Sequence, residues 1–217
     1  MEDVLKVTRE ALEKNGMETF YAKTKEEVLE TVKTLIPKNA TVGAGGSSSL
    51  RECGILELLK TGDYNYLDRH KEGLTPDEAY QILKQSLTAE YYLSSSNAVT
   101  LDGQLYNVDG TGNRLAALNF GPEYVIFVVG RNKIVKDLKE ADIRVKTVAA
   151  PKNTVRLCRN TPCSKTGECI AITSGKNNDF NDGCDSPDRI CRNYLILGKQ
   201  KNDKRVKVIL CEESLGY

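Results

Sequence analysis

Five of the seven cysteines lie within one stretch of the chain, between residues 158 and 191. Four thiolates suit either a tetrahedral zinc ion or an iron–sulfur cluster. The spacing contains neither the paired C-x2-C of zinc ribbons nor the close run of ferredoxins, so disulfides or free thiols stay open as alternatives. Cys158 is either a thiol outside the ligand set or a replacement for one of the four ligands. The preferred metal ligands, which lie among Gly and Pro turn residues, are Cys163, Cys169, Cys184 and Cys191.

A turn rich in glycine and serine, residues 43–49, follows a short apolar run and precedes a helical pattern. A strand, a glycine-rich turn and a helix in this order can bind an anion through exposed backbone N–H groups. The turn matches neither a Walker motif nor G-x-G-x-x-G. A tight turn with a helix cap is the equally weighted alternative. The candidate ligand-binding residues here are Gly43, Gly45, Gly46, Ser47 and Ser48.

A second polar cluster, in residues 107–114, surrounds two glycines with side chains that can act on a ligand. Arg114 could pair with a carboxylate or phosphate through its planar fork. Asp109 could act as a base, or could simply cap the following helix. Both are catalytic candidates, although a plain turn with an N-cap is the simpler interpretation. The remaining candidate ligand-binding residues are Asn97, Gly110, Gly112, Asn113 and Lys133, the last of which a solvated turn explains equally well.

Helix and strand patterns alternate before residue 151 and must position these side chains. Helices are expected near residues 4–12, 24–35, 50–58, 75–87, 113–119 and 136–148, and strands at 20–22, 40–42, 91–93 and 124–129. Asp102-Gly103 predicts a hairpin turn between 97–101 and 104–108. We therefore expect one α/β domain over 1–217, with a mostly parallel sheet covered by helices. Residues 151–193 form the cysteine-rich, metal-binding segment, and two strands, 194–197 and 206–210, close the chain as a hairpin.

Charge and hydropathy exclude several classes of partner. The 31 basic and 30 acidic residues nearly cancel, which disfavours nucleic acid or an anionic membrane as the main partner. No apolar stretch approaches the roughly 20 residues of a membrane span. The charged N-terminal stretch lacks the apolar core of a signal peptide. A cytoplasmic protein is expected, and a homo-oligomer is compatible with these features.

Several motifs together resemble the LUD domain family, which is related to the small C-type subunit of bacterial lactate-utilisation systems. The resemblance covers nearly the whole chain. The cysteine region is similar to one branch of the family, while Ala44 stands where the family often has an aromatic residue. The motifs that carry the resemblance are 43–49, Asn97-Ala98-Val99-Thr100, Gly103, 107–114, Gly121-Pro122 and 129–133.

This resemblance implies a fold similar to that of ribose-5-phosphate isomerase, glucosamine-6-phosphate deaminase and the CoA transferases. It implies a phosphate, carboxylate or nucleotide-like ligand at the strand ends. It also implies a part in L-lactate oxidation beside other lactate-utilisation subunits, and it favours a [4Fe–4S] cluster, with zinc as the alternative. Two other functions stay open: a stand-alone enzyme of the isomerase, ligase or CoA-transferase type with structural zinc, and a non-catalytic assembly subunit.

Overall fold

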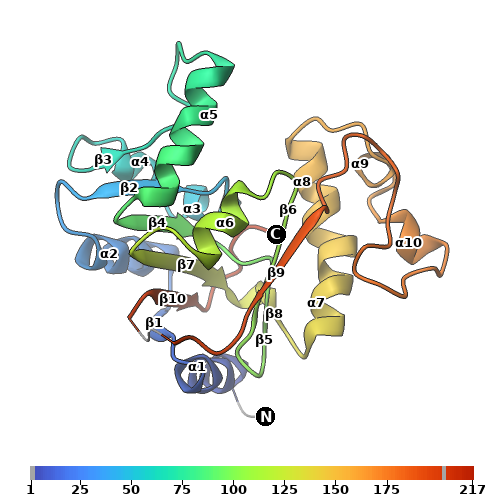
Figure 1. The fold of residues 1–217 in the computed structure, drawn as a ribbon. Helices are drawn as coiled ribbons and strands as arrows, with labels where there is room; N and C mark the ends of the chain where they lie inside the picture. Colours follow the sequence, from blue (N-terminus) through green and yellow to red (C-terminus); the bar gives the residue numbers. More distant parts are fainter. Residues whose placement is uncertain (1–2, 202–203) are drawn as a thin grey trace.

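A parallel sheet of six strands forms the centre of the protein (Figure 1). The structure is a computed structural model, and it describes residues 3–201 and 204–217. All neighbouring strands in this sheet run parallel, as the alternation of helices and strands predicts. The strands, in spatial order, are β1 (Glu18–Ala22), β10 (Val206–Cys211), β7 (Tyr124–Gly130), β4 (Tyr91–Ser94), β2 (Thr41–Ala44) and β3 (Asn65–Tyr66).

Both faces of this sheet are buried, because successive residues of a strand point to opposite sides. In β7, Ile126 and Val128 join one apolar cluster, and Val125, Phe127 and Val129 join the other. The first cluster packs under the helices α2 (Lys25–Leu35), α3 (Ser48–Glu52) and α4 (Ile55–Leu59). The second packs under α1 (Val4–Lys14), α6 (Asn113–Asn119) and part of a second sheet. The apolar run 124–129 is therefore a buried central strand, as predicted.

The second sheet has four strands and lies beside the first. Its spatial order is β8 (Ile134–Val135), β5 (Ala98–Thr100), β6 (Leu105–Asp109) and β9 (Asn193–Leu197). The pair β5–β6 is antiparallel, which confirms the predicted hairpin. Its outer face packs against a long helical segment made of α7 (Leu138–Arg144), a π-helical turn (Val145–Ala149) and α8 (Ala150–Arg156).

Three sequence expectations differ from the structure. The last two strands do not form a hairpin: β9 pairs with β6, whereas β10 enters the first sheet between β1 and β7. The physical reason is burial, because five of the six residues of β10 are buried and an exposed hairpin would leave them in water. The helix expected over 136–148 continues past Pro151 to Arg156, since a proline is tolerated in the first turn of α8. The pattern at 50–58 divides into α3 and α4 at Gly54, whose φ is +69°.

The cysteine-rich segment begins after α8 and contains two short helices, α9 (Pro162–Thr166) and α10 (Ile170–Thr173). In Figure 1 it lies beyond α8, on the side away from the first sheet. Helix α5 (Pro76–Gln85), expected near residues 75–87, projects from the opposite part of the molecule and starts with a capping box of Thr75 and Glu78. In the described part of the chain, no helix is long and apolar enough to cross a membrane.

Candidate functional site

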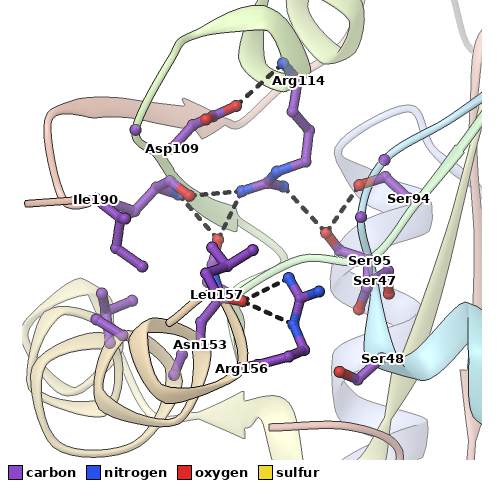
Figure 2. Close-up of a pocket in the computed structure, with 18 of the residues that line it drawn as sticks. Ser47, Ser48, Ser94, Ser95, Asp109, Arg114, Asn153, Arg156, Leu157 and Ile190 are labelled. Atoms are coloured by element: carbon purple, nitrogen blue, oxygen red, sulfur yellow. Dashed lines mark hydrogen bonds between the residues drawn. The ribbon is translucent and has the colours of Figure 1, made fainter. Parts of the chain in front are cut away.

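A pocket of about 290 Å³ opens at the carboxyl ends of three neighbouring strands, β2, β4 and β7. This edge is where open α/β sheets bind ligands. The turn after β2, the polar run after β4 and the residue Lys133 after β7 all reach it, and α8 and the loop after β6 close its other side. Figure 2 shows Ser47, Ser95, Arg114 and Arg156 around this space.

Most of the residues predicted to bind a ligand line this pocket, although they come from four separate segments. Gly43 and Gly112 do not line it. Gly43 lies within β2 against Ser86 and Tyr92, and Gly112 precedes α6 with a φ of +91°. Those that line the pocket are Gly45, Gly46, Ser47, Ser48, Asn97, Asp109, Gly110, Asn113, Arg114 and Lys133.

The glycine and serine turn brings other side chains close to the backbone. A Cβ on Gly45 would lie 3.1 Å from Cδ of Arg114, and a Cβ on Gly46 would lie 3.0 Å from Nη2 of Arg69. The hydroxyl of Ser47 accepts the N–H of Leu50 and so caps α3. That helix has only five residues, so its dipole contributes little to the pocket. The turn therefore caps a helix, as the alternative interpretation predicts, and it also lines the pocket, while anion binding by the turn stays a prediction.

Lys133 supplies a buried positive charge at the floor of the pocket. Its side chain is 3 % exposed, and its Nζ donates to Oγ of Ser49 at 2.8 Å and of Ser95 at 2.9 Å. Burial, together with the nearby charges of Arg144 and Arg114, lowers the pKa of Lys133 to about 7. The solvated-turn interpretation of this lysine is therefore wrong. Lysines poised near neutral pH in a cavity are frequent at functional sites.

Arg114 holds the surrounding loops together. Its Nη1 donates to the carbonyl of Ser95 and to Oδ1 of Asn107, and its Nη2 donates to Oδ1 of Asn97 and the carbonyl of Val108. The protein therefore already occupies both ends of the fork that was expected to grip a ligand. Arg114 still adds positive charge to the pocket wall.

Asp109 has the simpler of its two predicted roles. Its carboxylate accepts the backbone N–H groups of Thr111 and Arg114, and so fixes the turn before α6 (Figure 2). Asn97 has a related role, because its side-chain oxygen also accepts the N–H of Val108. These two side chains shape the wall of the pocket by binding the backbone.

Three arginines at the rim were missed from the sequence: Arg69, Arg156 and Arg159. Nη2 of Arg69 and Nη2 of Arg156 both lie within 4.0 Å of the position that a Cβ would take on Gly46. Asn153 and Tyr217 orient Arg156 through hydrogen bonds of 2.7 to 3.1 Å. No sequence signal groups these arginines, because they come from a loop and from a helix end that are far apart along the chain.

The four cysteines chosen as metal ligands surround one small cavity on the far side of α8. Cys158 does not line it and is exposed. Burial, and to a smaller extent the other three cysteines, raise the pKa of the Cys191 thiol to about 12. The guanidinium of Arg189 holds the loop by donating to the carbonyls of Asn181, Cys184 and Cys191. All seven cysteines are within the described residues, and each is a free thiol.

The donor set around this cavity fits a metal or cluster in its chemistry, since soft thiolates are the ligands that iron–sulfur clusters and zinc prefer. The distances between these side chains are less favourable for a metal site than their chemistry. Within residues 3–201 and 204–217, no three His, Cys, Asp or Glu side chains are close enough together to hold a metal ion.

Comparison with known proteins decides the family. A family model named LUD domain matches residues 5–211. This chain belongs to the LUD domain family. A crystal structure of a DUF162 family protein from Deinococcus radiodurans is similar to the LUD domain described here, with a TM-score of 0.50 and 15% identity over 96% of each chain. At that identity the similarity shows the fold alone. No curated protein matches the chain.

The pocket and the cysteine cavity of this LUD domain share a wall. Ala150, Ile190 and Cys191 line both. Ala150 begins α8, while Ile190 and Cys191 end the cysteine-rich loop just before β9. The pocket and the cysteine cavity are therefore separated by only one layer of side chains.

Proposed function

We propose that this LUD domain protein is a component of L-lactate or related 2-hydroxy-acid oxidation, and that the pocket binds the carboxylate of the acid. The observation that carries the proposal is Lys133, a buried amine held by two serines at the floor of a pocket. Four arginines and this lysine line the pocket, against the single carboxylate of Asp109. A site of this composition favours an anion.

The redox part of the proposal assigns an iron–sulfur cluster to Cys163, Cys169, Cys184 and Cys191. Their shared cavity and their thiol chemistry support it. When bound, such a cluster would supply one-electron transfer. Asp182, Gly183 and Cys184 line the cavity that would hold the cluster, and Lys146 orders the preceding part of the loop by donating to Oδ1 of Asn177 and the carbonyl of Asp179.

Partner subunits and a cytoplasmic location belong to the same proposal. Electrons taken from the substrate must leave the chain, and exposed apolar side chains near the cysteine-rich segment support a contact with other lactate-utilisation subunits. They are Val155, Leu157, Ile170 and Phe180. The reducing cytoplasm would keep the thiols available as ligands.

Anaerobic purification followed by iron, sulfide and zinc analysis and visible spectroscopy tests the redox part. We expect iron and sulfide in equal amounts and an absorbance that reductant bleaches. Replacing both Cys184 and Cys191 by serine should abolish the iron content, whereas Cys158→Ser, outside the cavity, should retain it. Zinc alone, or full iron content in the double variant, would contradict this part.

The anion-binding part is tested separately, by titrating the full chain with L-lactate and following binding by calorimetry. We expect binding that Lys133→Met weakens by about tenfold or more, because a charge-assisted contact is lost. Arg51→Met, an exposed arginine on α3 that does not line the pocket, is the matched control. If the unchanged chain, Lys133→Met and Arg51→Met all bind L-lactate with equal affinity, Lys133 is not part of the binding site.

A further inference from the structure

The positive charge of the pocket lies at two depths. Lys133 is at the buried floor, while Arg69 is half-buried and Arg156 is exposed at the rim. The arginines whose charges lower the pKa of Lys133 are Arg144 and Arg114. Arg69 and Arg156 instead lower the pKa of His70, beside the rim, which is also lowered by burial. Floor and rim therefore differ in burial and hold different positive charges.

The two rim arginines lie close together, and neither forms an ion pair with a carboxylate of the described residues. The Nη2 atoms of Arg69 and Arg156 both lie above Gly46, close enough for one carboxylate or phosphate group to contact both. The ion pairs among the described residues involve neither of them, nor Arg159. Two adjacent guanidinium groups repel each other unless an anion lies between them.

The size of the pocket also exceeds what lactate needs. At a volume of about 290 Å³, it would hold about ten water molecules at ~30 Å³ each. Lactate has only six non-hydrogen atoms, and with its carboxylate at Lys133 it offers only a hydroxyl and a methyl group to the rest of the pocket. Neither group is an anion, so the rim arginines would have no ion-pair partner in the ligand.

We infer that the pocket takes a 2-hydroxy acid that carries a second anionic group, a carboxylate or a phosphate, at the end remote from its 2-hydroxy carboxylate. The carboxylate next to the hydroxyl lies at Lys133 and Ser95, and the second anion lies above Gly46 between Arg69 and Arg156. This inference rests on the proposed function, because it assumes that the ligand is a 2-hydroxy acid.

Calorimetry of the full chain at pH 7 and constant ionic strength tests this with matched probes. L-Malate is L-lactate with its methyl replaced by a carboxymethyl group, and 3-phospho-L-glycerate carries a phosphate on the corresponding carbon with the same configuration at C2. We expect at least one of the two to bind about tenfold or more tightly than L-lactate. The tighter of the two identifies the second group as carboxylate or phosphate. Glycerol 3-phosphate, which lacks the carboxylate, should bind more weakly than 3-phospho-L-glycerate.

Variants at the rim distinguish this proposal from general attraction by positive charge. Arg69→Met should reduce the affinity for the doubly charged probe to within about threefold of that for L-lactate, and leave L-lactate binding nearly unchanged. Arg51→Met should change neither. If L-lactate binds as tightly as both doubly charged acids, or if Arg69→Met weakens all probes equally, the inference is overturned while the proposed anion site stands. If no probe binds, both fall.

Discussion

Lys133 shows how much about the environment of a single residue can be predicted from the sequence. The sequence places a lysine after a buried strand, in Gly130-Arg131-Asn132-Lys133, and a lysine in such a turn is as often solvated as buried. Its burial depends on Ser49 and Ser95, which lie 84 and 38 residues away along the chain. Gly45 and Gly46 were easier to predict as site residues, because glycine permits close approach of other groups whatever those groups are.

The buried amine should lower the stability of the folded protein. Its pKa is about 7 in the folded chain and ~10.4 in the unfolded chain. The cost of burying the charge is therefore full below pH 7 and disappears as the pH rises towards 10. We expect Lys133→Met to raise the free energy of unfolding by about 1–2 kcal/mol at pH 6, and by less at pH 9. Urea denaturation at both pH values measures this, and a variant destabilised at pH 6 would show that the amine is structural.

Two glycines of the segment 43–49, Gly43 in β2 and Gly46 in the turn after it, should respond differently to replacement by alanine. A Cβ on Gly43 would lie 2.9 Å from both Cβ of Ser86 and Cδ2 of Tyr92, so Gly43→Ala should cost about 1–3 kcal/mol of stability. A Cβ on Gly46 would meet only the ends of Arg69 and Arg156, which can move. Gly46→Ala should therefore leave the midpoint of thermal unfolding unchanged and weaken the binding of the anion. The reverse pattern would contradict the placement of the rim arginines.

At the level of helices and strands, the sequence predicted which polar segments follow the strands. It did not predict which side chain connects these segments. The segments after β2 and β4 and the segment 109–114 were each expected to be polar and near a ligand, and they converge in one pocket. Arg114 was expected to face the ligand, but its side chain joins the loop after β4 to β6 through hydrogen bonds. Its spacing along the chain could not show this, because its acceptors lie on β6 and on the loop after β4.

Replacing Arg114 should therefore affect stability more than binding alone. Arg114→Met leaves four acceptors around the former guanidinium without this donor, and we expect a loss of about 3–5 kcal/mol in the free energy of unfolding. Arg51→Met should change it by less than about 0.5 kcal/mol. Urea titrations of the two variants compare these values. A stable Arg114→Met chain that has lost only anion binding would return Arg114 to the role predicted from the sequence.

At the scale of the whole molecule, the parallel α/β sheet was predictable because its strands are short apolar runs between helices. The second sheet was not, because β9 is partly exposed and its partner β6 lies some 85 residues earlier in the chain. That pairing matters for the site. It places the end of the cysteine-rich loop, with Ile190 and Cys191, between the pocket and the thiol cavity.

The positions of the cysteines predict their reactivity in the folded, metal-free chain. Cys158 is exposed and should be alkylated first. Cys53 and Cys211 are buried in the core, and burial raises the pKa of Cys53 to about 12, so both should react only as the chain unfolds. Mass spectrometry after timed iodoacetamide treatment at pH 8 gives the order. Labelling of Cys211 at the rate of Cys158 would contradict the fold around β10.

The most direct test of the account is the titration of Lys133 itself, followed by NMR of the chain labelled with 13C at lysine Cε. Lys133→Met assigns the resonance. The account predicts a pKa of about 7 in the free protein and a higher value when L-lactate is added, because a bound anion stabilises the charged amine. It also predicts that L-lactate binds more weakly as the pH rises above 7. A Lys133 that titrates near its ordinary value of ~10.4, or whose pKa L-lactate leaves unchanged, would contradict it.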